Sequence, residues 1–153
     1  DGDFHLILDN ESLVRASGYG DVESLRKRLP EELRSIELHL LKSHQYQKYI
    51  YDYYQGDKEA LGKIPHKQDG TEFQKQVWKA IANVPYGATI SYKQLAKESG
   101  NEAAIRAAGT ICGLNRLILL VPCHRVLKSD GSIGSYLYGP RIKESLLRHE
   151  GSI

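Results

Sequence analysis

Cysteine, histidine and arginine follow one another at Cys123, His124 and Arg125, directly after Pro122. A thiolate is the nucleophile of many covalent reactions, and neighbouring histidine or cationic side chains favour its formation. A buried structural thiol is the commoner role of a single cysteine. Cys123 therefore has two candidate roles, a reactive nucleophile and a packing residue.

The residues before Cys123 predict how it is positioned. Leu117 to Val121 is an apolar run too short for a core helix and ended by a proline, which predicts a buried strand. Cys123 is then expected where the strand stops, at the rim of the core. Adjacent side chains of a strand point to opposite faces, so His124 reaches Cys123 only through a bridging water or a break at Pro122.

Two helices joined by a tight turn are predicted upstream of that strand. Ser91 and Gln94 have the spacing of a capping box at the start of the first helix, and Gly100 ends it. Asn101 is expected to cap the second helix, which runs towards Gly113.

A further helix is predicted before this pair. Thr71 can cap it, and the turn at Pro85, Tyr86 and Gly87 closes it. Its apolar positions follow the helical period and are Phe73, Val77, Trp78 and Ile81.

The second helix of the pair has an unusually smooth surface, formed by Ala103, Ala104, Ala107, Ala108 and Gly109. Without long polar side chains it is poorly equipped to recognise bases in the major groove of DNA. A smooth helix with one long cation, Arg106, suits the minor groove, with a side chain inserted where a base has left the stack. The alternative is that small residues allow close helix packing in a core.

The N-terminal residues predict a small sheet with a helix. Phe4 to Leu8 and Leu13 to Tyr19 are apolar segments joined by a polar turn, as in a hairpin. Asp21 to Leu29 predicts a short capped helix, and Ile36 to Leu41 predicts a third strand.

A tyrosine-rich helix from His44 to Gly56 follows, and its aromatic stripe is typical of core packing. The stretch from Gly56 to Gly70 contains turn residues and charges and predicts a linker. The chain is therefore expected to divide into residues 1–69, an α/β part with the linker, and residues 70–153.

Composition agrees with a globular protein, with 41% hydrophobic and 26% charged residues. No apolar run is long enough to span a membrane, so a cytoplasmic protein, or a nuclear one in a eukaryote, is expected. There is no Met, even at position 1, so we expect the first residues to be missing. Two cysteines and six histidines show neither a disulfide framework nor a zinc spacing, and no metal is expected.

Positive charge is concentrated near the cysteine. From Glu72 to Lys128 there are eight Lys and Arg against three acidic residues, a net charge of +5, whereas the rest of the chain has a net charge of −3. Such a segment favours a nucleic-acid partner, although a solvated charged face would produce the same pattern.

The pentapeptide from Pro122 to Val126 resembles the active-site signature of the O(6)-alkylguanine-DNA alkyltransferases. Flanking residues fall at the spacing of the same family and extend the resemblance from Gly70 to Gly151, about half the chain. They are Gly70 to Gln74, Val77, Trp78, Val84 to Gly87, Ser91, Tyr92, Arg106, Ala107, Asn115, Lys143, Leu146, Leu147 and Glu150.

The resemblance implies a fold and a set of site residues. The fold is an N-terminal sheet with a helix, ribonuclease H-like, followed by a mostly helical domain with a helix-turn-helix. The implied catalytic residues are Cys123, His124, Glu150, Asn115 and Tyr92. The implied DNA-binding residues are Arg106, Ala107, Gly109, Cys112 and Ser91, and those of the substrate pocket are Val126, Tyr136, Leu137 and Pro122.

The implied roles form one reaction. Glu150 orients His124, which takes the proton of Cys123 through a water, while Asn115 supports the active-site turn and Tyr92 helps the leaving guanine take a proton. Arg125 is expected to anchor the site by pairing with backbone or carboxylate groups. Without the resemblance, Asn115 could equally cap a helix and Glu150 could pair locally with Arg148.

The implied function is repair of DNA by irreversible transfer of the alkyl group from O(6)-alkylguanine, and more weakly from O(4)-alkylthymine, to the protein cysteine. The partner is double-stranded DNA bound through the minor groove, no cofactor is needed, and a monomer is expected. A damage-recognition protein without catalysis is one alternative, against which Cys123 argues, and a cysteine hydrolase is another.

Two departures from the family pattern stand out. Asn115 is followed by Arg116 where the family often has proline, and Tyr138 occupies a position where the family has glycine. If the backbone at Tyr138 required a positive φ, tyrosine there would cost about 1 kcal/mol or the loop would change its path.

Overall fold

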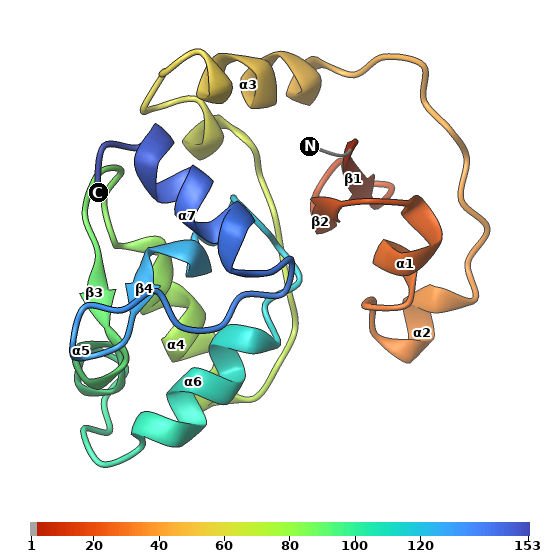
Figure 1. The fold of residues 1–153 in the computed structure, drawn as a ribbon. Coiled ribbons are helices and arrows are strands. Elements are labelled where there is room, and N and C mark those ends of the chain that lie inside the picture. Colours follow the sequence, from red (N-terminus) through yellow and green to blue (C-terminus); the bar gives the residue numbers. More distant parts are fainter. Residues whose placement is uncertain (1–2) are drawn as a thin grey trace. The chain divides into compact units, whose positions relative to one another are not determined.

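The computed structural model describes residues 3–153, which form two compact units (Figure 1). The first unit comprises the chain up to Gln68 together with Arg116–Leu120, and the second comprises Asp69–Asn115 and Val121–Ile153. The division expected between residues 69 and 70 does not account for Arg116–Leu120, which leave the second unit and return to it. The fold is mixed α/β, with small sheets and a mostly helical remainder, as expected.

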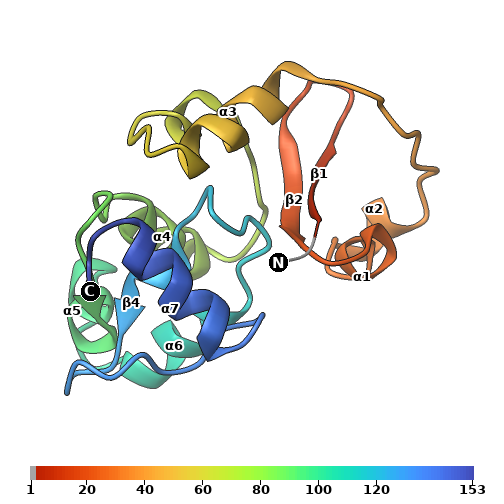
Figure 2. The ribbon, with the colours of Figure 1, turned by 45° about the horizontal axis from the view of Figure 1, so that its top comes forward.

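The first unit is built on the predicted hairpin. β1 (Phe4–Leu8) and β2 (Val14–Tyr19) pair antiparallel and lie side by side in Figure 2. The Asp9 carboxylate accepts hydrogen bonds from the backbone N–H groups of Glu11 and Leu13, at 2.8 and 3.1 Å, and these bonds close the turn. Within the described residues, this sheet has only these two strands.

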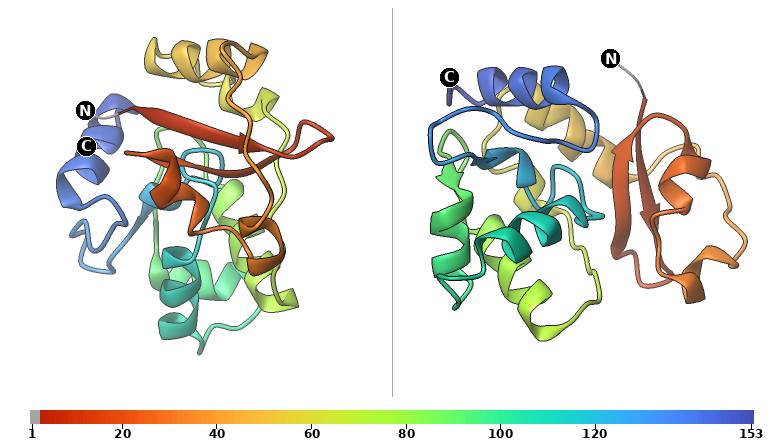
Figure 3. Two further views of the ribbon diagram at one scale, coloured as in Figure 1. Left: turned by 90° about the vertical axis from the view of Figure 1, so that its right-hand side faces the viewer. Right: turned by 60° about the horizontal axis from the view of Figure 1, so that its bottom comes forward.

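Two short helices lie on one side of the hairpin, as the right-hand view of Figure 3 shows. α1 (Val22–Arg26) begins after Asp21, which caps it as predicted by accepting from the backbone N–H of Ser24 at 2.8 Å. α2 (Glu31–Arg34) is an element that the hydrophobic pattern does not predict. The apolar core under them consists of Ile7, Ala16, Leu25 and Leu29, with Leu33 and Leu38 packed against it.

One prediction for the first unit is wrong. Ile36–Leu41 forms no strand, and Leu40 is 93% exposed. Its alternating pattern has no neighbouring strand to pair with, so it stays irregular.

The predicted linker from Gly56 to Gly70 has structure of its own. It contains the 3₁₀ helix η1 (Leu61–Lys63) and then hydrogen-bonds along β2 at Val14. The chain passes from the first unit to the second within this stretch, after Gln68.

The predicted tyrosine-rich helix is α3 (Gln45–Tyr54). His44 caps it, since its Nδ1 accepts from the backbone N–H of Tyr46 at 3.2 Å. Tyr46 and Tyr53 are buried, and the Tyr46 hydroxyl donates to the carbonyl of Ser12 at 2.7 Å. The stripe therefore packs the first unit, as expected of an aromatic face.

The apolar run Leu117–Val121 is buried as predicted but is not a strand. Each residue is at most 7% exposed, yet among the described residues the run makes only a single bridge, from Leu117 to Ser17 of β2, and then turns. Leu119 has a φ of 71°, an uncommon value for a residue other than glycine. A buried turn satisfies the same apolar pattern as a strand, so the pattern alone could not distinguish them.

The helices that pack on one another in the second unit are α4 (Glu72–Ala82), α5 (Tyr92–Glu98) and α6 (Ile105–Gly113). Thr71 caps α4 with a complete capping box. Its hydroxyl accepts from the backbone N–H of Gln74 at 3.2 Å, and the Gln74 side chain accepts from the backbone N–H of Thr71 at 2.9 Å. The Trp78 indole donates to the carbonyl of Ile111 at 3.2 Å and ties α4 to α6.

α5 and α6 have the predicted order of helix, turn and helix, but not both predicted caps. The Ser91 hydroxyl accepts from the backbone N–H of Gln94 at 3.0 Å, while the Gln94 side chain bonds elsewhere along α5. Asn101 does not cap α6. Its side chain accepts from the backbone N–H of Ala103 within the turn, and α6 begins only after Ala104, without a side-chain cap.

A short parallel pair and a last helix complete the second unit. β3 (Ile90–Ser91) pairs with β4 (Val126–Leu127) and runs directly into α5. α7 (Pro140–His149) is the blue helix in Figure 1. Its buried positions recur at helical spacing and are Lys143, Leu146, Leu147 and the following Glu150. No helix among residues 3–153 is both long and apolar enough to cross a membrane.

Replacing Thr71 by alanine is expected to lower the free energy of unfolding of the second unit by about 1 kcal/mol, because the first amides of α4 lose their side-chain acceptor. Thr71→Ser keeps the hydroxyl and is the matched control, for which we expect a smaller change. Urea denaturation followed by the fluorescence of Trp78, the one tryptophan of the chain, measures both. Equal losses would mean that the cap is not the stabilising feature.

Candidate active site

Cys123 lies at a sharp bend rather than at the end of a strand. Pro122 has φ −81° and ψ 66°, and the backbone N–H of Cys123 donates to the carbonyl of Val121 at 2.8 Å, the geometry of an inverse γ-turn. The 3₁₀ helix η2 (Cys123–Arg125) starts directly after it. This bend is the break at Pro122 that His124 requires in order to share a site with Cys123.

Asn115 supports the bend from the end of α6. Its Nδ2 donates to the carbonyl of Val121 at 2.8 Å, the same oxygen that accepts from Cys123, and the residue is 1% exposed. The C-cap of α6 is Leu114, so helix capping is not the role of Asn115. The side chain fixes the carbonyl about which the turn is built.

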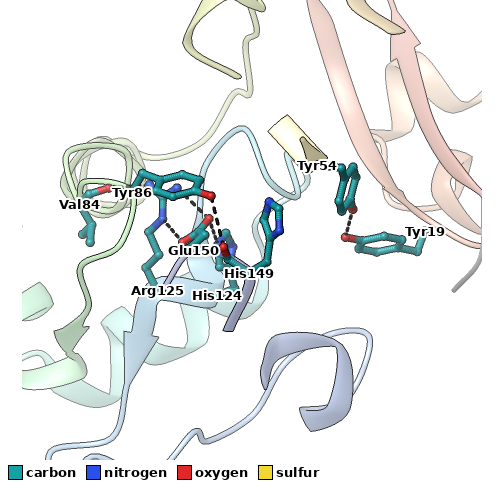
Figure 4. A network of polar contacts seen from close by, with 8 residues as sticks. All are labelled: Tyr19, Tyr54, Val84, Tyr86, His124, Arg125, His149 and Glu150. Carbon is teal, nitrogen blue, oxygen red and sulfur yellow. Dashed lines mark hydrogen bonds and ion pairs between the residues drawn. The ribbon is translucent and has the colours of Figure 1, made fainter. Parts of the chain in front are cut away.

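His124 is fully buried, and its two ring nitrogens have different surroundings. Its Nε2 lies 2.8 Å from Oε1 of Glu150. Figure 4 shows the two side chains next to each other. Its Nδ1 is buried and has no hydrogen-bond partner among the described residues. Because an ionised carboxylate can only accept, Nε2 donates and Nδ1 holds the free lone pair. An imidazole in this tautomer can accept a proton at Nδ1.

Glu150 also binds Arg125, which points toward it in Figure 4. The Arg125 Nε and Nη2 donate to the two Glu150 oxygens, each at 2.9 Å, and its Nη1 donates to the carbonyl of Val84 at 2.7 Å. Arg125 thus anchors the site as predicted. The alternative pairing of Glu150 with Arg148 is wrong, since Arg148 bonds to Glu144 at 2.7 Å.

The charges of this buried group follow from its contacts. Although burial raises the pKa of Glu150, hydrogen bonds and charge interactions with His124 and Arg125 outweigh it and lower that pKa to about 2. Burial lowers the pKa of His124, against the opposing effect of Glu150. At neutral pH the site therefore contains a carboxylate, a guanidinium and a neutral imidazole.

The predicted turn at Pro85, Tyr86 and Gly87 covers the Glu150 backbone. A Cβ added to Gly87 would lie 3.2 Å from the Glu150 carbonyl oxygen, and the φ of Gly87 is 85°, so only glycine fits without strain. The Tyr86 hydroxyl donates to the carbonyl of His149 at 3.4 Å, and its ring lies 5.8 Å from the Arg125 guanidinium.

Tyr92, in the first turn of α5, lies close to both cysteines. Burial, with further contributions from Cys112 and Cys123, raises its pKa to about 12, so the phenol stays protonated at neutral pH. Gly109 of α6 faces its ring, since a Cβ there would lie 3.6 Å from Tyr92 Cδ1. The Lys143 Nζ lies 6.0 Å from the ring centroid.

Lys143 is a site residue to which the sequence pattern assigned no role. It is fully buried, and its Nζ donates to the carbonyls of Val126 at 2.7 Å and Ser135 at 3.2 Å. It holds β4 and the loop before α7 in place. Its spacing in the sequence could have indicated this role. Lys143 occupies a position on the apolar face of α7, and Glu150, directly after the helix, continues that face.

The candidate DNA-binding residues differ in how exposed their side chains are. Arg106 and Ala107 are exposed on α6, and the Arg106 side chain makes no hydrogen bond or ion pair within the described part of the chain. Ser91 is the cap of α5. The prediction that Cys112 binds DNA is corrected, because the residue is only 7% exposed and its Sγ lies 3.9 Å from the carbonyl oxygen of Cys123. Its thiol faces the reactive turn and not the surface.

The candidate pocket residues also differ in exposure. Pro122 and Val126 are buried, Tyr136 is half-buried and Leu137 is 47% exposed. The backbone of Tyr138 has no positive φ, so its substitution for glycine introduces no strain there; Gly139 has a φ of 92° and provides the turn into α7. Residues 3–153 contain no group of three or more His, Cys, Asp and Glu arranged to hold a metal ion.

Residues 72–152 match the family model described as 6-O-methylguanine DNA methyltransferase, DNA binding domain. The chain belongs to this family. The matched residues include η2, Asn115 and Glu150. The resemblance seen in the motif around Cys123 is therefore confirmed.

Known methyltransferases are similar in sequence to part of this chain. A methylated-DNA--protein-cysteine methyltransferase of Methanosarcina acetivorans is 48% identical over 84 residues, 55% of this chain and 54% of that protein. The chain spans between 25% and 58% of the length of several curated relatives.

Solved structures extend the likeness to almost the whole chain. The O6-methylguanine methyltransferase of Mycobacterium tuberculosis is 28% identical, with a TM-score of 0.72, over 94% of this chain and 84% of that chain. The O6-methylguanine-DNA methyltransferase of Pyrococcus kodakaraensis is 26% identical, with a TM-score of 0.76, over 97% of this chain and 90% of that chain.

Acidification is expected to destabilise the second unit in two stages. Below pH 6.5 the unfolded chain protonates His124 while the folded protein resists it, and between about pH 4.5 and 2 the stability contributed by the lowered pKa of Glu150 is lost. The second stage amounts to on the order of 3 kcal/mol.

Urea denaturation at a series of pH values, followed by Trp78 fluorescence, measures these losses. Glu150→Gln, less stable at neutral pH because Arg125 loses its charged partner, should lack the second stage. The same acid dependence in the variant and the wild type would contradict the assignment.

Proposed function

We propose that this protein repairs DNA by transferring the alkyl group of O(6)-alkylguanine, and more weakly of O(4)-alkylthymine, to Cys123. The observation that carries the proposal is the buried His124, whose Nε2 is held by Glu150 and whose Nδ1 is free to accept a proton, on the residue next to Cys123. A neutral imidazole oriented by a carboxylate is suited to activating a thiol. Membership of the methyltransferase family supports the same chemistry.

The reaction is a displacement at carbon. A water accepts the Cys123 proton and passes one to His124 Nδ1, and the thiolate then attacks the alkyl carbon as its bond to guanine O6 breaks. Tyr92 is the proton donor for the departing guanine, and its phenol, whose pKa is about 12, still carries its proton at neutral pH. The product is a thioether without a leaving group, so each molecule reacts once and no cofactor is required.

Asn115 and Arg125 act as positioning residues in this mechanism. Asn115 holds the γ-turn through the Val121 carbonyl, and Arg125 holds the carboxylate that orients His124. The hydrogen bonds of both side chains are buried, and buried hydrogen bonds restrict motion more than hydrogen bonds in water do. The nucleophile is therefore kept in one orientation before the substrate arrives.

The DNA-binding element in this proposal is a helix-turn-helix formed by α5 and α6, which binds the minor groove of double-stranded DNA. The exposed part of α6 includes Arg106, Ala107 and Thr110, a smooth surface with a single cation. Arg106 fills the space left by a flipped nucleotide. The family model that matches this part of the chain is described as a DNA binding domain.

The remaining parts of the proposal concern organisation. Residues 70–153 perform both DNA binding and alkyl transfer, and residues 1–69 form a ribonuclease H-like domain. Pro122, Val126, Tyr136 and Leu137 border the base pocket, the protein acts as a monomer, and it works in the cytoplasm or, in a eukaryote, the nucleus. A damage-recognition protein that binds alkylated DNA without reacting remains the alternative.

Cys123→Ser is expected to abolish alkyl transfer and to leave DNA binding largely intact, because sulfur supplies the nucleophile and the helices supply the affinity. Mass spectrometry after incubation with DNA that contains O(6)-methylguanine should find one added methyl group on wild-type Cys123 and none on the variant. An unmodified wild-type protein bound to the lesion would identify a recognition protein, and repeated turnover would identify a hydrolase.

Arg106→Ala is expected to slow the reaction with duplex DNA at least about tenfold, with little effect on the free base O(6)-benzylguanine, because only the duplex leaves a space in the stack to be filled. Lys97→Ala removes one exposed positive charge from α5 and is the matched control, for which we expect only a small, salt-dependent loss of affinity. Single-turnover rates on both substrates decide, and equal losses of Arg106→Ala on both would remove the reason for its role.

A further inference from the structure

The second cysteine of the chain takes no part in the function proposed above. Cys112 lies in the last turn of α6, and both it and Cys123 are free thiols with 7% and 6% exposure. The Cys112 Sγ lies 3.9 Å from the carbonyl oxygen of Cys123. The two cysteines are therefore neighbours within one unit of the fold.

The surroundings of Cys112 make its thiol a weak acid. Interaction with the Cys123 thiol, followed by burial, raises the pKa of the Cys112 thiol well above its ordinary value. Cys112 therefore keeps its proton at neutral pH, and Cys123, the residue before His124, is the thiol that the relay proposed above deprotonates. An oxidant that reacts with thiolates is therefore directed to Cys123.

We propose that Cys112 is a resolving cysteine, which forms a reversible disulfide with Cys123 after a hydroperoxide has oxidised Cys123. The position of the Cys112 sulfur, buried and 3.9 Å from the Cys123 carbonyl oxygen, carries this proposal, because the two sulfurs can meet without separating α6 from η2. The chemistry concerns the two sulfurs alone and does not require the proposed repair reaction.

The reaction has two steps. The Cys123 thiolate attacks one oxygen of hydrogen peroxide, the O–O bond breaks, and the second oxygen leaves as water after taking up a proton, so that Cys123 becomes a sulfenic acid. The Cys112 sulfur then attacks the Cys123 sulfur, the S–O bond breaks, and the oxygen leaves as water with the Cys112 proton. The two sulfurs lose two electrons in total, and the peroxide gains them.

A nucleophile that reacts only once is particularly exposed to oxidative loss. A sulfenic acid without a neighbouring thiol oxidises further to a sulfinic acid, which thiol reductants do not reverse. A disulfide stops that progression, and under reducing conditions it is transient. Cys112 would thus preserve Cys123 through an oxidising episode.

The test is a peptide map of the wild-type protein treated with a small molar excess of hydrogen peroxide and then alkylated. Trypsin separates the cysteines, because it cuts after Arg106, Arg116 and Arg125. We expect the two cysteine peptides to be linked, with the loss of two hydrogens, and both thiols to return on treatment with dithiothreitol. This readout needs neither DNA nor alkyl transfer, so its failure is distinguishable from failure of the proposed function.

Variants test the role of each sulfur. Cys112→Ser and Cys112→Ala should accumulate several-fold more sulfinic acid at Cys123, which dithiothreitol does not reverse, while Cys123→Ser should leave Cys112 reduced. Thr89→Ser, exposed between α4 and β3, is the matched control and should behave as wild type. Sulfinic Cys123 without linked peptides in the wild type, or equal recovery in Cys112→Ser and the wild type, would overturn the proposal.

Discussion

The Glu150 carboxylate is the group on which the candidate active site depends. A buried carboxylate is strongly unfavourable unless charged and hydrogen-bonding partners surround it. Arg125 supplies two hydrogen bonds and the opposite charge, and His124 supplies a third hydrogen bond. One side chain directly after α7 therefore fixes two consecutive residues of η2. Rotation of Arg125 would leave a buried charge unpaired, and rotation of His124 would remove a buried hydrogen bond.

Hydrogen bonds to backbone carbonyls hold the same turn from its other sides. Asn115 binds the carbonyl at the centre of the γ-turn, and Lys143 binds the carbonyl of Val126 in β4. β4 pairs with β3, which runs into α5, and the Cys112 thiol of α6 contacts Cys123. The helices that we propose bind DNA are thus connected directly to the reactive turn, so displacement of either helix changes the support of Cys123.

Local features of the fold were the most predictable from the sequence. The caps at Asp21 and Thr71 and the apolar periods of the helices are determined by residues close in sequence. The Leu117–Val121 run was misassigned because burial does not distinguish a strand from a turn. The capping role of Asn101 failed because the side chain bonded within the turn instead.

The site itself was less accessible to local reasoning. His124 and Glu150 are 26 residues apart, and only the family resemblance paired them. Chemistry alone left Arg148 as an equal partner, because a charge at a helix end says nothing about which distant side chain reaches it. The proximity of Cys112 to Cys123 depends on how α6 meets η2, a tertiary relation that no spacing in the sequence encodes.

Arg116–Leu120 belong to the first unit, although the residues on both sides of them in the sequence belong to the second. The four apolar residues 117–120 are buried there, and the Ser17 hydroxyl donates to the carbonyl of Ile118 at 2.7 Å. A fragment without the hairpin would retain this apolar segment with nothing to cover it, a surface that promotes self-association. Exchange of the first unit for an unrelated domain would therefore require residues 116–120 to change with it.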